Sequence, residues 1–243
     1  AQNVKNFSEL QKQVGYLKEQ KDRLDVGGLG KARFILKTGG SLGDLYTQAD
    51  LKRDDNGMVE ISPAGALITV NNQPDIKLGS VFPKCNLAWS NQFSWKGFNL
   101  SVFIQGSYGN DIFNASRIET EGMYDGKNQS TKVLNRWKIP GQITNVPKAN
   151  FKLLNSTYFI EDGSYLRLKD VSLSYNFKGK LLQKWGITRL QPYFTATNLL
   201  TWTSYSGMDP EVNQWGNSGT VQGIDWGTYP HSRSYVFGIN VEF

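Results

Sequence analysis

The chain has 243 residues, of which 39% are hydrophobic, 20% charged and 13% aromatic, and its formal net charge is +6. The basic residues are scattered along the whole length, which excludes the clustered basic face or arm of a nucleic-acid-binding protein. No apolar run approaches the roughly 18 residues of a membrane-spanning helix, and the single cysteine, Cys85, allows neither an internal disulfide nor a cysteine-rich metal site.

Residues 1–83 predict a region of loops with one helix and one hairpin. The chain opens on polar residues rather than on the apolar stretch of a signal peptide, so we expect a processed or internal fragment. Apolar residues recur at roughly helical spacing within residues 7–24, which predicts the only helix, and a glycine-rich stretch ends it. Residues 33–83 are rich in Gly, Asp and Asn. Together with the turn signal DNG at residues 55–57, they predict an elaborate loop that carries a hairpin.

Five later segments alternate apolar and polar residues, as strands with one apolar face do. They cover residues 84–95, 98–105, 164–177, 187–202 and 234–243. Two residues, Asn91 and Phe103, depart from the alternation. In the last and most regular segment, Tyr235, Phe237, Ile239, Val241 and Phe243 alternate with Ser234, Val236, Gly238, Asn240 and Glu242.

The connections between these strands alternate between short ones, residues 96–97 and 178–186, and long ones, residues 110–162 and 203–230. Bacterial outer-membrane barrels have short turns on one side and long loops on the other. Long loops without structure of their own count against a compact soluble domain. The fold class we expect is therefore all-β, with antiparallel strands of a transmembrane β-barrel and long extracellular loops.

The composition of the two strand faces supports the same fold. One face is rich in Ser, Asn, Thr and Gln, which suits a water-filled interior, and the other could meet lipid. Aromatic residues gather beside the two short turns, as in an interfacial girdle: Trp95, Phe98, Tyr175, Phe177 and Trp185. Five strands cannot close such a barrel, so we expect further strands N-terminal to this segment. The alternative is a soluble or surface-anchored carbohydrate-binding β-sandwich, whose strands also have one apolar face.

Several sequence blocks in order resemble the C-terminal part of the SusC/RagA-family TonB-dependent transporters of Bacteroidota outer membranes. They are GGSLGDLY at 39–46, KRDDNG at 52–57, WSNQFSWKGF at 89–98, FIEDGSYLRLKD at 159–170, ATNLL at 196–200, SGMDPEV at 206–212, YPHSRSY at 229–235 and the terminal Phe243. The resemblance implies a 22-stranded barrel in the cell outer membrane, with residues 84–243 as its last strands. Residues 1–83 would then form an extracellular loop region.

The resemblance also implies a function and a set of partners. Family members import glycans or oligopeptides, powered by TonB through an N-terminal part that is absent here, and pair with a SusD-like lipoprotein that caps the barrel. Further expected partners are the rest of the barrel with its plug, lipid or lipopolysaccharide, and the barrel assembly machinery. The alternating last strand resembles the signal that this machinery recognises, so Tyr235, Phe237, Ile239, Val241 and Phe243 would serve insertion.

Catalytic chemistry is not predicted. The only histidine, His231, has no cysteine or second histidine with which to share a metal, and the acidic pairs lie in loop-like sequence. We therefore expect no enzyme activity, no metal and no cofactor. One cluster in or beside residues 203–230 predicts contact with a ligand or with the lid lipoprotein, because aromatic faces in loops can bind sugars or peptide side chains. It comprises Trp202, Tyr205, Trp215, Trp226 and Tyr229. The alternative is that these residues hold the loop in place.

Overall fold

The computed structural model describes residues 23–29, 32–37, 40–47, 50–56, 58–71, 76–150, 156–179, 182, 184–212 and 222–243. The chain divides into two compact units. The first, here called the loop unit, combines Ala1–Pro83, Asn110–Asp162 and Ser206–Thr228. The second, here called the sheet unit, combines Lys84–Gly109, Gly163–Tyr205 and Tyr229–Phe243.

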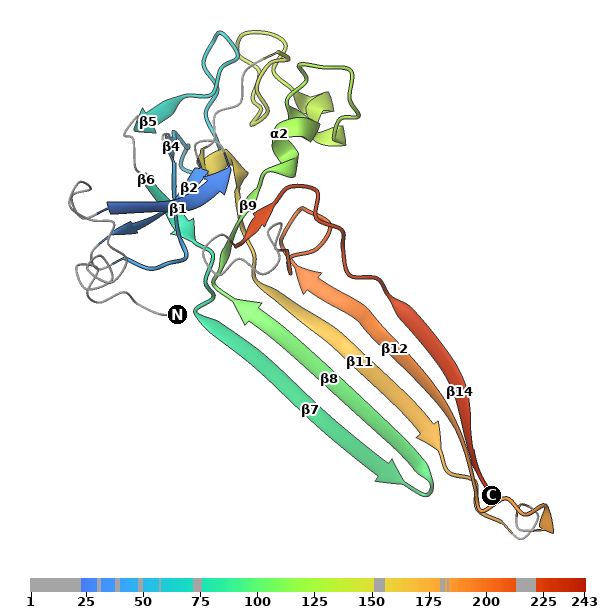
Figure 1. Ribbon diagram of the computed structural model, residues 1–243. Coiled ribbons are helices and arrows are strands. Elements are labelled where there is room, and N and C mark those ends of the chain that lie inside the picture. Colours follow the sequence, from blue (N-terminus) through green and yellow to red (C-terminus); the bar gives the residue numbers. More distant parts are fainter. Residues whose placement is uncertain are drawn as a thin grey trace. The chain divides into compact units, whose positions relative to one another are not determined.

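The sheet unit is one 5-stranded antiparallel sheet in the order β14-β12-β11-β8-β7 (Figure 1). Its strands are β7 (Cys85–Trp95), β8 (Phe98–Tyr108), β11 (Tyr165–Tyr175), β12 (Arg189–Thr203) and β14 (Ser234–Glu242). Each of the five strands predicted from the alternation is confirmed. Strands that follow one another in this unit lie next to one another in the sheet, so the topology is an up-and-down meander.

The tight turn between β7 and β8 is made by Lys96 and Gly97, which both have positive φ, 45° and 94°. Two successive residues with positive φ form a type I′ turn, whose twist matches that of the strands it joins. This turn fixes the hairpin register, so that Trp95 lies opposite Phe98.

The register sorts the side chains of the sheet onto two faces, because residues directly opposite one another in neighbouring strands share a face. Five rows of opposed residues, one above another, make the apolar face. They are Trp95, Phe98 and Tyr175; Phe93, Leu100, Leu173, Phe194 and Phe237; Asn91, Val102, Val171, Ala196 and Tyr235; Trp89, Ile104, Leu168 and Leu200; and Leu87, Gly106, Leu166 and Trp202. Asn91 is the polar exception, as the sequence pattern predicted.

The opposite face of the sheet is polar. Two of its rows are Ser94, Asn99, Ser174, Tyr193 and Gly238, and Gln92, Ser101, Ser172, Thr195 and Val236. Hydrogen bonds cross this face, such as that between the hydroxyls of Ser172 and Thr195 at 3.0 Å. Phe103, which broke the alternation in the sequence, lies on this polar face opposite Ser90 and Asp170.

A β-bulge in β11 explains a change of phase in its sequence. The register shifts between Leu168 and Asp170 relative to both neighbouring strands. Leu166 and Leu168 lie on the apolar face at even positions, whereas Val171 and Leu173 lie on it at odd positions. Since a one-residue slip moves every later side chain to the other face, the extra residue Lys169 keeps both halves of the strand in one apolar face.

The apolar face is not covered by the described residues. The exposed fractions of Phe237, Ile239 and Trp89 are 79%, 65% and 48%. A second sheet packed on this face would bury such side chains. The described part of the chain therefore does not support the β-sandwich alternative.

The described residues of the loop unit form three small sheets (Figure 1). A 4-stranded sheet has the order β1-β2-β3-β6, made of β1 (Arg23–Leu29), β2 (Ala32–Lys37), β3 (Asp44–Thr47) and β6 (Ile76–Ser80). A second sheet pairs β4 (Asp50–Leu51) with β5 (Thr69–Asn71), and a third has the order β10-β9-β13, made of β10 (Ile160–Asp162), β9 (Asp111–Asn114) and β13 (Ile224–Asp225). Helix α2 (Ser116–Glu121) and the 3₁₀ helices η1 (Thr131–Asn135) and η2 (Thr157–Phe159) complete the unit.

One hydrophobic core holds these pieces together. It includes Phe34 from β2, Leu45 from β3, Phe113 from β9, Phe159 from η2 and Ile224 from β13, each at most 1% exposed. The rings of Phe113 and Phe159 meet edge to face at a centroid distance of 5.9 Å. Segments far apart in sequence thus share one core.

Part of the N-terminal prediction is wrong. Most of the helix expected at residues 7–24 lies outside the described residues, but its last two residues belong to strand β1, which also includes Gly27 and Gly28. Residues 33–83 contain five paired strands rather than a loop with one hairpin. The physical reason is that β3, β4 and β5 have only 4, 2 and 3 residues, too few to show a clear alternation. The turn at residues 55–57 is supported by the antiparallel bridge between Arg53 and Val59, although Gly57 itself lies outside the described residues.

No helix among the described residues combines the length and the apolar character needed to span a membrane.

A close approach of β8 and β11 gives a first testable prediction. A Cβ atom added at Gly106 would lie 2.8 Å from the backbone oxygen of Tyr165 in the neighbouring strand. Because that atom cannot move without displacing β11, Gly106→Ala should destabilise the sheet by about 1–3 kcal/mol. Thermal unfolding of the purified full-length protein, followed by circular dichroism, measures this. Ser101→Ala on the polar face of the same strand is the control, and equal unfolding temperatures for the two variants would contradict the prediction.

Candidate functional site

A tight turn after β13 fixes the position of Trp226. β13 pairs in parallel with β9, so that Asp225 lies opposite Asn114. The buried Asp225 carboxylate accepts a hydrogen bond from the N–H of Thr228 at 3.1 Å, and the N–H of Gly227 donates to the Ser116 hydroxyl at 2.7 Å. Gly227 has φ 72°, a left-handed conformation that glycine adopts without strain. Trp226 therefore lies at the tip of a turn whose backbone is hydrogen-bonded to Ser116 and to the Asp225 side chain.

The facing wall is formed by α2 and the segment that follows it. The segment folds back onto the helix, because the N–H of Ser130 donates to the carbonyl of Thr120 at 2.8 Å. The Lys127 ammonium forms ion pairs with Glu119, in a very short contact, and with Asp125 at 3.2 Å. Hydrogen bonds to Glu119 and Asp125 raise the pKa of Lys127. Lys127 thus places a largely exposed cation beside the helix.

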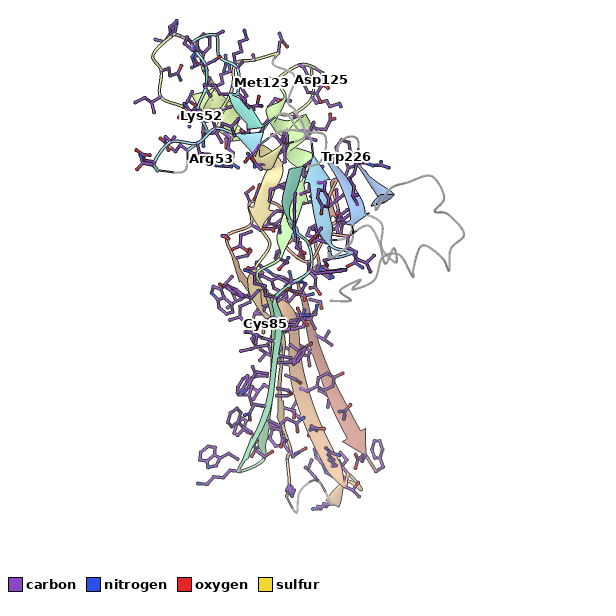
Figure 2. All side chains as sticks on the ribbon, turned by 90° about the vertical axis from the view of Figure 1, so that its left-hand side faces the viewer. Lys52, Arg53, Cys85, Met123, Asp125 and Trp226 are labelled. Carbon is purple, nitrogen blue, oxygen red and sulfur yellow. The ribbon has the colours of Figure 1, made fainter. Side chains whose placement is uncertain are left out.

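These two features border an open, shallow pocket of about 390 Å³. Its lining combines an aromatic ring, an ammonium, a carboxylate and two hydroxyl groups, and comprises Ser116, Glu119, Thr120, Lys127, Trp226 and Gly227. Figure 2 labels Trp226 and Asp125 among the side chains of the loop unit. Convergent polar groups around an aromatic surface are typical of a small-ligand site.

A buried charged cluster anchors α2 to the rest of the loop unit. Arg117 donates two hydrogen bonds to Glu121, at 2.7 and 3.0 Å, and one each to the Tyr158 carbonyl at 2.8 Å and to Glu161 at 3.1 Å. The Tyr158 hydroxyl donates to Glu121 at 2.7 Å. Burial alone would raise the pKa of Glu121, but the hydrogen bonds and charge of Arg117 lower it. Burial and the Glu121 charge raise the pKa of Tyr158. Arg117 and Glu121 therefore stay charged at neutral pH, and the hydrogen bonds of the cluster connect α2 to η2 and β10.

Glu161 extends this cluster to the start of the segment that carries Trp226. Its carboxylate accepts hydrogen bonds from the N–H and the hydroxyl of Ser206, each at 2.8 Å. It also accepts one from the Asn114 amide at 3.1 Å. The same acidic group thus binds α2, β9 and residue 206.

The structure does not place the five aromatic residues of the predicted ligand or lid contact on one defined surface. Trp226 belongs to the loop unit and lines the pocket, whereas Trp202, Tyr205 and Tyr229 belong to the sheet unit. Tyr205 is buried, and Trp202 and Tyr229 are exposed. Trp215 lies outside the described residues. The role of this group as a whole stays a prediction.

Sequence reasoning missed the other groups around the pocket. Ser116, Glu119 and Lys127 precede Trp226 by about a hundred residues of sequence, and only the pairing of β9 with β13 brings the two segments together. Among the described residues, no three or more His, Cys, Asp or Glu side chains are placed to hold a metal ion.

The predicted assembly signal lies in or directly after β14. Tyr235, Phe237, Ile239 and Val241 lie opposite Ala196, Phe194, Pro192 and Leu190. All four are exposed, and so is Phe243 beyond the strand end. Their exposure leaves them open to contact, and their role in assembly stays a prediction.

Comparison with known proteins gives close relatives. No family model matches the chain. The chain is 33% identical to TonB-dependent receptor P3 of Formosa agariphila over 83% of its own length and 20% of that protein. It is 24% identical to TonB-dependent receptor SusC of Bacteroides thetaiotaomicron over 63% of its length and 14% of that protein. A solved structure of the RagAB peptide transporter matches 93% of the chain with a TM-score of 0.73 and 26% identity, and the chain covers 25% of it.

These likenesses, together with the antiparallel meander, place the chain among the TonB-dependent receptors. Within that class it belongs to the SusC/RagA family, because its relatives include SusC and its fold matches that of the RagAB transporter. The resemblance seen in the sequence blocks is confirmed. The chain spans about a fifth of the length of the curated relatives it matches.

Proposed function

We propose that the sheet unit forms part of the wall of an outer-membrane barrel of about 22 strands, the size of the large outer-membrane transporters. The observation that carries this proposal is the continuous apolar face of the meander, which the described residues leave open. In water such a face would be a large exposed apolar patch, which monomeric soluble proteins rarely show. In lipid it meets hydrocarbon, while the opposite polar face lines a water-filled interior.

The dimensions of the sheet support this placement. β7, β8 and β11 each have 11 residues. A tilted strand needs roughly 9–11 residues to cross the hydrocarbon of a bilayer. Aromatic side chains cluster at the tight-turn end, where the ring centroids of Phe98 and Tyr175 lie 4.5 Å apart and those of Tyr175 and Phe177 lie 4.6 Å apart. Such a girdle suits one membrane interface. The free edges of β7 and β14 would pair with further strands of the longer protein.

The activity we propose for the full-length protein is the import of glycans or oligopeptides, driven by TonB. Its support is the family, since relatives are named TonB-dependent receptors and the matched structure is that of a peptide transporter. Residues 1–83 and the long connections would face the outside, where a SusD-like lipoprotein caps the barrel. Lipopolysaccharide would contact the apolar face. Tyr235, Phe237, Ile239, Val241 and Phe243 would present the assembly signal. No catalytic step is proposed.

Two measurements on the full-length protein test the proposal. It should remain in the membrane pellet after washing in high salt and enter solution only with detergent. A strain that lacks the gene should lose growth on at least one glycan or peptide mixture as sole carbon source, and a strain that lacks TonB should lose growth on the same one. Extraction by buffer alone, or growth that does not depend on TonB, would overturn the proposal.

A further inference from the structure

We infer that the pocket beside Trp226 binds one neutral sugar ring, so that this protein recognises a glycan rather than a peptide. The inference rests on the proposed import function and names its substrate class. Four features carry it: the exposed aromatic ring on a hydrogen-bonded turn, the arrangement of hydrogen-bonding groups, the balance of charge in the lining, and the absence of a strand edge from the lining.

Trp226 provides an apolar surface on a turn whose backbone is already ordered. The residue is 39% exposed. In its turn the N–H of Gly227 donates to the Ser116 hydroxyl, and the N–H of Thr228 donates to the Asp225 carboxylate. A pyranose ring has an apolar face of C–H groups and a polar edge of hydroxyls, which matches a large amphipathic aromatic ring. Because the backbone of the turn is already ordered, little backbone conformational entropy is lost when a sugar stacks on the ring.

The polar groups of the lining can both donate to and accept from sugar hydroxyls. An ammonium has three donors and a carboxylate has about four acceptor sites. The contacts of Lys127 with Glu119 and Asp125, and that of the Tyr124 hydroxyl with Glu119 at 3.2 Å, leave capacity on both groups. The Thr120 hydroxyl donates to the Ser116 carbonyl at 3.1 Å, so its oxygen lone pairs can still accept. A hydroxyl ligand could be bound from several sides.

The charges of the lining favour a neutral ligand. Glu119 and Lys127 are the only charged residues among the six that line the pocket, and they pair with each other. A charged ligand would have to compete with this ion pair, whereas a neutral hydroxyl can add to it.

The backbone around the pocket offers little to a peptide. Pairing with the edge of a β-sheet is one recurring way to bind an extended peptide. None of the six lining residues belongs to a strand, since they come from α2, the following segment and the turn after β13. At about 390 Å³ the pocket is at the small end of the range of roughly 300–1,000 Å³ for ligand sites, which suits a single ring of a longer chain.

Binding of the purified full-length protein to an array of neutral oligosaccharides tests the inference. The probes are α- and β-linked glucans, galactans, mannans and xylans, with neutral tetrapeptides printed beside them. The wild-type protein should bind at least one oligosaccharide. Trp226→Ala should weaken that binding about tenfold, which corresponds to about 1.4 kcal/mol, and Trp226→Phe should recover part of it. Trp185→Ala, an exposed tryptophan of the sheet unit, should bind like wild type.

The outcomes separate this inference from the proposed function. If no oligosaccharide binds, or if binding is unchanged in Trp226→Ala, the sugar site is wrong even where TonB-dependent growth persists. Binding to the tetrapeptides that is lost in Trp226→Ala would likewise overturn the sugar assignment and leave import intact. A protein that binds oligosaccharides through Trp226 but shows no TonB-dependent growth would retain the site and overturn the import function.

Discussion

Val171→Arg is expected to abolish the accumulation of folded protein in the outer membrane. Val171 lies in the middle of the five rows of the apolar face, between Val102 and Ala196. If this face meets lipid, an arginine there lies near the centre of the bilayer, where it costs about 2–4 kcal/mol. The shift in electrophoretic mobility between unheated and boiled outer-membrane samples measures the folded fraction, which should fall by more than about tenfold.

The neighbouring residue provides the matched control. Ser172 lies on the polar face, opposite Ser101 and Thr195. Ser172→Arg adds the same side chain to the same strand one position away, and it should leave most of the protein folded in the membrane. If the sheet were exposed to water on both faces, the two variants would behave alike, because surface substitutions usually change stability by less than about 0.5 kcal/mol. Equal folded fractions would therefore contradict the membrane placement.

Arg117→Ala is expected to destabilise the loop unit by about 3–5 kcal/mol, the usual cost of leaving one partner of a buried ion pair alone. The Glu121 side chain is 2% exposed and would lose both hydrogen bonds from the guanidinium. Limited proteolysis of the full-length protein measures the effect as faster cleavage within residues 110–162. Arg117→Met combined with Glu121→Leu removes both charges and should recover part of the loss. Cleavage at the wild-type rate in Arg117→Ala would contradict the prediction.

The same ion pair predicts a dependence on pH. The pKa of Glu121 is lowered below its ordinary value of 4.5, so the folded state binds this proton less readily than the unfolded state. The resulting stabilisation is fully present above about pH 4.5 and is lost as the pH falls through the lower pKa of the folded state. Protection from acid-stable proteases should therefore decline below about pH 4.5 in the wild type and decline less in Glu121→Gln.

The sheet unit could be predicted well because the patterns that define its strands lie within short stretches of sequence. Alternation with a period of two residues identifies a strand and its apolar face at once, and neighbours in the meander are also neighbours in sequence. Phe103 and Asn91 could be recognised as exceptions on the same basis. The bulge at Lys169 needed the register of β8 to become visible, although the change of phase between Leu168 and Val171 was present in the sequence.

The loop unit was harder to predict because several of its strands are very short and because β9 pairs with β10 and β13, which are distant in sequence. β4 and β13 have 2 residues each, too few to show any period. The pocket was hard to predict for the same reason. Trp226 was identified because it is aromatic and lies in a loop. The pairing of β9 with β13 brings Ser116, Glu119 and Lys127 next to it, and this pairing spans a long stretch of sequence. Trp202 and Tyr229 are equally aromatic but belong to the other unit.

The discontinuity of the loop unit has a consequence for biosynthesis. Its core residue Phe113 packs with Ile224, so the core is incomplete until synthesis has passed residue 224. By then four of the five strands of the sheet unit have been made. Closing so long a loop costs entropy before any contact repays it, which slows folding. A chain that ends between residues 163 and 223 would lack Ile224 and leave the aromatic side chains of this core partly unpacked, which favours aggregation.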